Sequence, residues 1–310
     1  MKRTLAALVA ATALLAACGD TDADDQVVGG DPAAEEPAGG GEPGTDAPER
    51  IVSLSPSATE LLFAIGAGDQ VVAVDNMSNH PSEAPMTDLS AFEPNLEAIS
   101  THEPDLVVVD GTDPELVEGL TTVGIEVLAA PAPATLEDLY AQIEELGEAT
   151  GEAEGAADLV AEMTSDIEAI LAEVPELDEP LTFFHELDDL LYSVTSSTFI
   201  GELYAMVGLE NVADAADPDG AHGGYPQLSA EYLVEADPDL VFLADTKCCA
   251  QTPETFAARP GFGSLTAVRE GNVVALDDDV ASRWGPRVVD LLEEIVEAVA
   301  SASSDEAAAA

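Results

Sequence analysis

The sequence predicts an α/β protein of two similar lobes, each with a parallel sheet, joined by one long α-helix. A helix–strand motif occurs twice, and in both copies seven positions separate the leading glutamate, Glu97 or Glu231, from a proline. A second pair of similar segments precedes these copies in the same order, Glu60–Gly66 (ELLFAIG) and Glu202–Gly208 (ELYAMVG). Repeated segments that keep both order and spacing indicate two halves of similar build.

The first lobe, residues 50–150, alternates short apolar runs with helical segments. Ser57 and Glu60 have capping-box spacing before an apolar run, which predicts a helix start. Alternation at this spacing favours a parallel sheet covered on both faces. The expected strands are 51–54, 71–74, 106–109 and 125–129, and the expected helices are 61–65, 96–100, 114–123 and 136–149.

A helical pattern without a break covers residues 151–175, between the two halves. Such a helix is long enough, at about 1.5 Å per residue, to pass from one lobe to the other. A further surface helix of the first lobe is the alternative.

The second lobe, residues 176–300, repeats this alternation. Residues 260–268 are expected to form a loop or a short helix. The expected strands are 181–185, 239–243 and 272–276, and the expected helices are 199–207, 229–235 and 287–299, followed by a flexible tail, 301–310.

The N-terminus has the pattern of an exported, lipid-anchored protein. Lys2 and Arg3 precede an apolar run too short to span a bilayer, typical of a signal peptide over residues 1–17. The run ends in Leu-Ala-Ala-Cys, which resembles the bacterial lipoprotein box with Cys18 as the lipidated residue; an ordinary signal peptide is the alternative. Residues 18–49 are acidic and rich in Gly and Pro, so they are expected to form a disordered tether.

The formal net charge is −55, with 63 acidic residues against 8 Lys and Arg. Nucleic acid and anionic lipid surfaces are therefore poor partners. Because 46% of the residues are apolar and lie in periodic segments, we expect a folded domain with an acidic, salt-adapted surface rather than a disordered chain.

Several linked motifs resemble one family. These are Arg50–Glu60 (RIVSLSPSATE), Pro94–Glu97, Pro104–Val107, Phe199–Leu203, Gly208–Val212 and Ser282–Arg287 (SRWGPR). They are similar to the substrate-binding lipoproteins of ABC importers for cobalamin, ferric siderophores and haem. The resemblance covers about Arg50 to Ala300, and it implies two α/β lobes joined by a helix with the ligand cleft between them.

The resemblance also implies how the protein meets its importer. In the family, one glutamate on each lobe docks onto arginines of the permease, and Glu97 and Glu231 stand at the matching positions. Two carboxylates at equivalent places form a two-point charge contact that fixes orientation. Solvated surface glutamates are the alternative.

The expected cleft residues come from both lobes. Aromatic side chains suit a large planar ligand, and arginines suit its carboxylates or amides. His80 stands where relatives often have Tyr, either as a hydrogen-bonding residue or as a ligand of a chelated metal. The candidates are Ser55, Ser57, Ala58, His80 in its Asn79–Pro81 loop, Phe92, Tyr192, Tyr225, Arg283 and Trp284.

Cys248 and Cys249 are adjacent, and in an exported protein they form either a vicinal disulfide or two free thiols. A disulfide there would be strained, because neighbouring Cα atoms are about 3.8 Å apart. It would present a rigid apolar face to the ligand.

Together these features predict a monomeric, lipid-anchored extracytoplasmic protein, not an enzyme and without a cofactor, that delivers cobalamin or a related corrinoid to an ABC importer permease. A ferric siderophore or haem is the alternative ligand. A zinc or manganese binding protein using His80, His102, His185 and His222, or a hydrolase using Glu186 and Asp188, are rivals of other classes.

Overall fold

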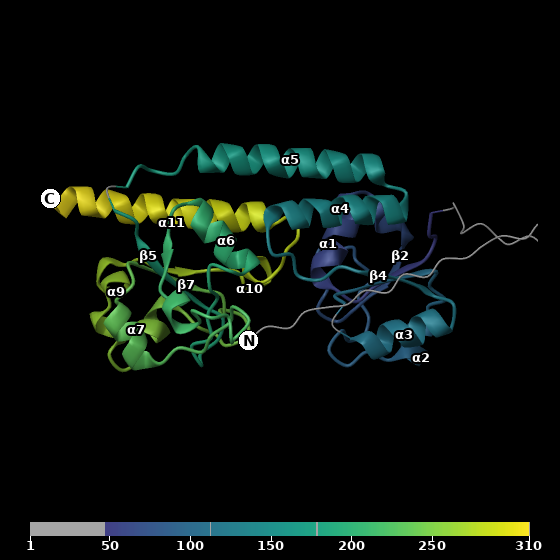
Figure 1. The fold of residues 1–310 in the computed structure, drawn as a ribbon, viewed down its shortest axis with the longest axis horizontal. Helices are drawn as coiled ribbons and strands as arrows, with labels where there is room; N and C mark the ends of the chain where they lie inside the picture. The colour runs from purple at the N-terminus through teal and green to yellow at the C-terminus, as the bar shows by residue number, and fades with distance from the viewer. Residues whose placement is uncertain (1–46, 112, 178, 310) are drawn as a thin grey trace, which may run out of the picture. The chain divides into compact units, whose positions relative to one another are not determined.

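Two four-stranded parallel sheets form the centre of the fold, one in each lobe, as predicted (Figure 1). The computed structural model describes residues 47–111, 113–177 and 179–309. The strands are β1 (Ile51–Ser53), β2 (Val71–Val74), β3 (Leu106–Val109), β4 (Glu126–Ala129), β5 (Thr182–Glu186), β6 (Glu210–Asn211), β7 (Leu240–Leu243) and β8 (Val273–Ala275). The strand orders are β2-β1-β3-β4 in the first sheet and β6-β5-β7-β8 in the second. Numbered along the chain within each lobe, both sheets therefore have the order 2-1-3-4.

The predicted signal peptide, nearly all of the predicted tether and Cys18 lie outside the described residues. The folded unit already includes Glu49, because the backbone amides of Glu49 and Arg50 donate to the Asp105 carboxylate at 3.0 and 2.8 Å. No helix within the described ranges is long and apolar enough to cross a membrane.

The inner strands of each sheet are buried on both faces, and neighbouring residues of such a strand enter different cores. In β3, Leu106 and Val108 belong to a large core, while Val107 and Val109 belong to a smaller core of the first lobe. In β7, Leu240 and Phe242 enter the same large core, while Val241 and Leu243 enter a smaller core of the second lobe. Since side chains alternate along a strand, continuous apolar runs fit sheets covered on both sides.

The helices of the first lobe begin where the sequence supplies capping side chains. They are α1 (Pro56–Ala64), α2 (Leu96–Ser100), α3 (Pro114–Thr122) and α4 (Leu136–Thr150). Asn95 and Asp113 cap α2 and α3, and Thr135 forms a capping box with Asp138 at the start of α4. Buried side chains of α1 and α4 enter the large core.

The predicted capping box of α1 is wrong. Ser55, not Ser57, caps this helix, since its side chain accepts a hydrogen bond from the amide of Ala58, and Pro56 occupies the first turn. Proline fits there because its missing N–H has no partner in a helix start. Glu60 is therefore free to pair with residues of the other lobe.

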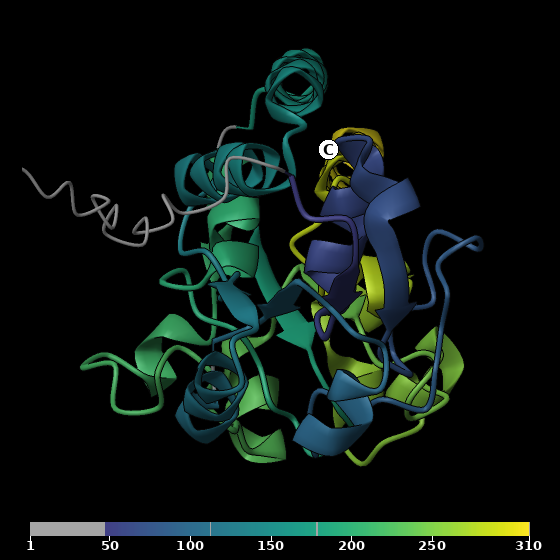
Figure 2. The same ribbon diagram turned by 90° about the vertical axis from the view of Figure 1, so that its right-hand side faces the viewer.

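Helix α5 (Ala153–Leu171) connects the lobes, running above α4 and α11 in both views (Figures 1 and 2). Its buried residues Leu159, Met163 and Ile167 share the large core with Leu146 of α4 and Ile295 of α11. One continuous core thus passes through both lobes and the helix between them.

The second lobe contains α6 (Phe199–Met206), α7 (Ala230–Ala236), α8 (Pro253–Ala257), α9 (Thr266–Glu270), α10 (Asp278–Ala281) and α11 (Val288–Ala309). Single 3₁₀ turns lie at Ala67–Gln70, Asp214–Ala216 and Phe262–Ser264. Helix α11 continues to Ala309, so the predicted end at Val299 and the predicted tail from Ser301 are wrong. Ser301–Ala309 is rich in alanine, a strong helix former, and extends the helix.

The short elements β6, α8 and α10 are absent from the sequence-based expectation. Two to five residues carry too little periodicity to be recognised. Helix α10 matters most of these, because it begins the segment that joins the lobes behind the cavity described next.

Candidate ligand-binding site

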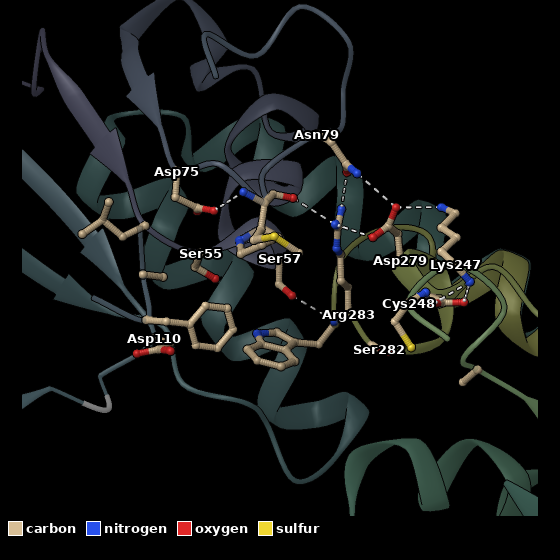
Figure 3. Close-up of a pocket in the computed structure, with 18 of the residues that line it drawn as sticks. Ser55, Ser57, Asp75, Asn79, Asp110, Lys247, Cys248, Asp279, Ser282 and Arg283 are labelled. Atoms are coloured by element: carbon tan, nitrogen blue, oxygen red, sulfur yellow. Dashed lines mark hydrogen bonds and ion pairs between the residues drawn. The ribbon is translucent and has the colours of Figure 1, made fainter. Parts of the chain in front are cut away.

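A cavity of about 690 Å³ lies between the lobes (Figure 3). Its volume is within the range of about 300–1,000 Å³ that is usual for small-molecule sites. Both lobes contribute to its wall, which comprises Leu54, Ser55, Pro56, Ser57, Asp75, Met77, Asn79, Ala91, Phe92, Asp110, Leu187, Ala244, Lys247, Cys248, Asp278, Asp279, Ser282, Arg283 and Trp284.

The cavity is placed at the carboxyl ends of the strands. Leu54, Asp75 and Asp110 directly follow β1, β2 and β3 of the first lobe, and Leu187 and Ala244 directly follow β5 and β7 of the second. Open parallel sheets bind ligands at this edge because the loops that leave the strands can diverge there. Asp75 and Asp110 are not among the ligand contacts expected from the sequence motifs. Their position directly after a predicted strand is the sequence signal that could have identified them.

Arg283 holds the lobes together behind the cavity. Its Nη1 donates to Glu60 Oε1 at 3.0 Å and its Nη2 donates to the Met77 carbonyl at 3.0 Å. Nη1 also donates to Asn79 Oδ1 (2.9 Å) and Nη2 to Asp279 Oδ1 (2.7 Å) (Figure 3). Three of these acceptors are on the first lobe. The guanidinium is thus occupied by protein groups, although its residue lines the cavity.

Glu60 is the buried carboxylate at the centre of this junction. It lies on α1 with 3% of its surface exposed and also accepts from Arg287 Nε at 2.9 Å. A second hydrogen bond from Arg287 Nη2 reaches Glu60 Oε1. A buried carboxylate is stable when such paired donors replace its hydration, so Glu60, Arg283 and Arg287 form an interlobe ion cluster.

The other cation on the cavity wall is also paired. Lys247 Nζ contacts Asp279 Oδ2 (2.7 Å) and Asp277 Oδ1 (2.5 Å). Burial opposes ionisation of Asp279, but hydrogen bonds from Lys247 and Asn79 and the charge of Arg283 lower its pKa below the usual value. Lys247 and Arg283 are the cations among the described wall residues, and carboxylates neutralise both.

The remaining wall is largely apolar. Phe92 has 85% of its surface exposed, which is unusual for so large an apolar side chain without a partner. Trp284 is half-buried, and its backbone amide donates to Ser57 Oγ of the first lobe at 3.2 Å. An aromatic pair from two lobes, beside Leu54, Met77 and Leu187, provides area for a bulky ligand body.

A cluster of buried carboxyl groups lies just behind the cavity in the second lobe. Glu186 forms a two-point ion pair with Arg259, at 2.7 and 2.6 Å. Burial, followed by the charge of Glu186, raises the pKa of the neighbouring Asp245 to about 7. Asp188 instead accepts the turn amides of Leu190 (3.0 Å) and Tyr192 (3.3 Å). Glu186 and Asp188 thus have structural partners and are not among the wall residues.

The histidines lie in different surroundings. His185 is fully buried, its Nδ1 is 2.8 Å from the Tyr204 hydroxyl, and burial lowers its pKa to about 3. His80 is exposed. Within the part of the chain that the structure describes, no group of three or more His, Cys, Asp and Glu side chains could hold a metal ion.

Comparison with known proteins identifies the family. The model of the periplasmic binding protein family matches residues 51–280. The chain belongs to this family. A cobalamin-binding protein of Halobacterium salinarum is 30% identical over 260 residues, 81% of this chain and 69% of that protein.

Two further similarities agree with this assignment. The uncharacterized ABC transporter substrate-binding lipoprotein YvrC of Bacillus subtilis is 28% identical over 261 residues, 81% of this chain and 80% of that protein. Among solved structures, the periplasmic heme-binding protein RhuT of Roseiflexus, in apo form, matches with a TM-score of 0.71 and 25% identity, covering 82% of this chain and 98% of that one.

The predicted ligand contacts of this periplasmic binding protein are brought together in part. Ser55, Ser57, Phe92, Arg283 and Trp284 line the cavity. His80, Tyr192 and Tyr225 are outside its wall, although Asn79, next to His80, lines it. Ala58 is fully buried in α1, so it has no surface with which to contact a ligand.

The two glutamates of the repeated motif are exposed on matching helices of this periplasmic binding protein. Glu97 is in the first turn of α2 and Glu231 in the first turn of α7. Both helices lie at the side of the folded unit away from α5 in the two views (Figures 1 and 2). The two exposed glutamates thus belong to helices on the same side of the folded unit.

Proposed function

We propose that this protein captures cobalamin or a related corrinoid outside the cytoplasm and delivers it to an ABC importer. The single observation that supports the ligand class best is that both wall cations, Lys247 and Arg283, are bound to carboxylates. Haem carries two propionates and many ferric siderophores are anionic, so they favour sites with an unpaired cation. The amide-rich, bulky corrinoid requires apolar area and hydrogen bonds instead.

The wall residues agree with that choice. No histidine or tyrosine occurs among the described residues of the wall, and these are two of the residue types that bind a haem iron. The wall does contain Met77 and Cys248, whose residue types also bind haem iron. Phe92 and Trp284 supply aromatic area, while Ser55, Ser57, Asn79 and Ser282 offer hydrogen-bonding groups for amides. The cobalamin-binding relative from Halobacterium salinarum supports the same ligand.

A ferric siderophore or haem complex is the second candidate. It is favoured by the fold similarity to RhuT, whose name states that it binds heme. An anionic group of such a ligand could pair with Arg283 or Lys247 only after it displaced Asp279 from that side chain. The corrinoid needs no such rearrangement.

Delivery is proposed to use Glu97 and Glu231 as one carboxylate from each lobe, docking on arginines of the permease. Their equal places in the two halves give a two-point contact whose spacing is fixed by the shared core. We further propose that Cys18 carries a lipid and that a tether over residues 18–49 holds the monomeric protein at the outer face of the cell membrane. In this role it acts as a transport protein, not an enzyme.

Titration of the full chain distinguishes the ligands. Cyanocobalamin, a ferric siderophore, haem and zinc are added separately while the fluorescence of Trp284, the single tryptophan, is followed. We expect saturable quenching by cyanocobalamin at one ligand per chain. N-acetyltryptophanamide at equal absorbance corrects for light that the ligand absorbs. Saturation by haem or the siderophore, without a response to cyanocobalamin, would contradict the corrinoid proposal.

A further inference from the structure

The pair Cys248–Cys249 lies in a turn that directly follows β7 and is held from both sides. The carboxylate of Asp278 accepts the backbone amides of Lys247 (2.9 Å) and Cys248 (2.8 Å). The carbonyl of Asp245 accepts the amide of Cys249 at 3.2 Å. Because both ends are fixed, the two cysteine side chains have little freedom to move apart.

The turn brings the two sulfur atoms together. Cys248 Sγ and Cys249 Sγ are 2.7 Å apart. The bond length of a disulfide is about 2.05 Å, so closure requires only a small further approach. The next residue, Ala250, has φ of 53°, a conformation that few residues other than glycine adopt and that the surrounding hydrogen bonds maintain.

The pair is accessible from the cavity. Cys248 is exposed and belongs to the wall (Figure 3). Cys249 is half-buried. Any change at these sulfurs therefore alters a surface that a bound ligand meets. The third cysteine of the chain, Cys18, lies outside the described residues.

The electrostatic surroundings disfavour spontaneous oxidation of the outer thiol. Partial desolvation of Cys248 at the cavity wall, its contact with Cys249 and the charges of Asp278 and Asp245 raise the pKa of this thiol to about 12. Since the thiolate is the reactive form, Cys248 is a poor nucleophile toward small oxidants. Once Cys249 has formed a mixed disulfide, however, its Sγ is the electrophilic sulfur nearest to Cys248.

We propose that Cys248 and Cys249 are a redox modification site that closes reversibly to a vicinal disulfide on the cavity wall. The oxidant is a disulfide, either an oxidised dithiol protein or a small molecule. The thiolate of Cys249 attacks one acceptor sulfur, forming a mixed disulfide and releasing one thiol. Cys248 then loses its proton and attacks Cys249 Sγ, releasing the second thiol. Two S–H bonds are lost, one S–S bond forms, and the acceptor gains two electrons and two protons.

Closure is expected to be readily reversible. Neighbouring Cα atoms across a trans peptide are about 3.8 Å apart, whereas those of most disulfides are about 4.4–6.8 Å apart. Strained and exposed disulfides are the more easily reduced ones. The closed ring replaces two thiols by a rigid apolar surface, so we expect oxidised protein to bind cyanocobalamin about two- to tenfold more tightly. This consequence, unlike closure itself, rests on the proposed function.

The test uses the full chain with Cys18→Ser, so that only this pair can react. The protein is equilibrated with mixtures of reduced and oxidised glutathione, alkylated with iodoacetamide and measured by intact mass and peptide mapping. We expect the oxidised form to lack two hydrogen atoms, to resist alkylation, and to regain both thiols in dithiothreitol. Two alkylated cysteines at every mixture, or stable glutathione adducts on the pair, would overturn the proposal.

A matched variant tests the closure of the disulfide, and a cyanocobalamin titration tests the effect of closure on ligand binding. Cys18→Ser with Cys248→Ser retains one thiol of the pair and should accumulate a glutathione adduct in place of the closed ring; its failure to react would contradict attack by Cys249. Cyanocobalamin titration of both redox forms then tests the consequence. Equal affinity would refute a role in ligand binding, while binding to neither form would refute the proposed ligand and leave the thiol result standing.

Discussion

At the scale of single residues, some of the predicted aromatic ligand contacts line the cavity and others lie outside its wall. Phe92 is on the wall and highly exposed, whereas Tyr192 is exposed outside it. We expect Phe92→Ala to weaken cyanocobalamin binding about tenfold, or about 1.4 kcal/mol, because a planar ligand loses one aromatic face. Isothermal titration calorimetry measures this change.

Tyr192→Ala is the matched control for that substitution. It removes an aromatic side chain that is 38% exposed, against 85% for Phe92, from the second lobe without altering the wall. The affinity of this variant for cyanocobalamin should equal that of the unsubstituted chain. An equal loss of affinity in both variants would show that Phe92→Ala does not act by removing a direct contact with the ligand.

Asp245 gives a prediction for pH. Because its pKa in the folded protein is raised from 3.8 to about 7, the folded state holds the proton more tightly than the unfolded chain. The resulting stabilisation is complete below about pH 4, where the unfolded chain is protonated as well, and is lost as the pH rises from there through about 7. Asp245→Asn, which keeps the shape and removes the charge, should reduce the loss of stability between about pH 4 and pH 7.

Urea unfolding of both proteins across that pH range measures the difference. The more distant carboxylates titrate in both chains, so the comparison reports on Asp245 together with Glu186, whose charge acts on it. Parallel pH profiles for the two proteins would contradict the assignment of a raised pKa to this carboxyl group.

Residue identity in the sequence predicted the location of some site residues better than their roles. Arg283 and Trp284 are predicted site residues because arginine and tryptophan are scarce in this sequence, and both line the cavity. The role of Arg283 was not predictable, since its partner Glu60 is 223 positions away and only the fold brings them together. Tyr192 and Tyr225 fitted the chemistry of a planar ligand, but no local pattern reports that they lie off the wall.

At the scale of elements, the repeat predicted more than single residues did. The spacing shared by Glu97 and Glu231 anticipated α2 with β3 and α7 with β7, because a proline followed by an apolar run fixes where each strand begins. The same argument failed for α11, where an alanine-rich end continues the helix without a periodic apolar face.

The interlobe ion cluster joins α1 to the segment before α11. Glu60→Gln should destabilise the folded unit by about 3–5 kcal/mol, because two arginines are left partly buried without their common carboxylate. Urea unfolding monitored by circular dichroism measures this loss. Glu118→Gln, on the exposed face of α3, is the control and should change stability by less than about 0.5 kcal/mol.

Similar midpoints for Glu60→Gln and Glu118→Gln would contradict the role of this cluster. A large loss in the first variant alone would show that the junction behind the cavity stabilises both lobes together. Because α5 and a continuous core also connect the lobes, we expect only slight hinge motion.

At the scale of the whole molecule, the acidic composition predicts a dependence on salt. A formal net charge of −55 produces repulsion throughout the folded surface, and ions screen it. The unfolding temperature should therefore rise markedly between low salt and molar potassium chloride. Equal unfolding temperatures at the two salt concentrations would contradict a salt-adapted surface.

The proposed delivery to the importer involves both lobes at once. The double substitution Glu97→Ala with Glu231→Ala should reduce uptake of cyanocobalamin by cells about tenfold or more, since both proposed contacts with the permease are lost. Binding of cyanocobalamin to the purified variant should be unchanged. Normal uptake would contradict docking through these residues, and Glu118→Ala with Glu235→Ala provides a control of equal charge.

The proposed function requires one bulky, nearly neutral ligand bound between the two sheets. A crystal structure of the chain grown with cyanocobalamin tests this requirement most directly. The corrin ring is expected in the cavity between Phe92 and Trp284, with Arg283 still bound to Glu60 and Asp279. A cavity without the corrin at saturating cyanocobalamin, or a corrin bound elsewhere on the protein, would contradict it.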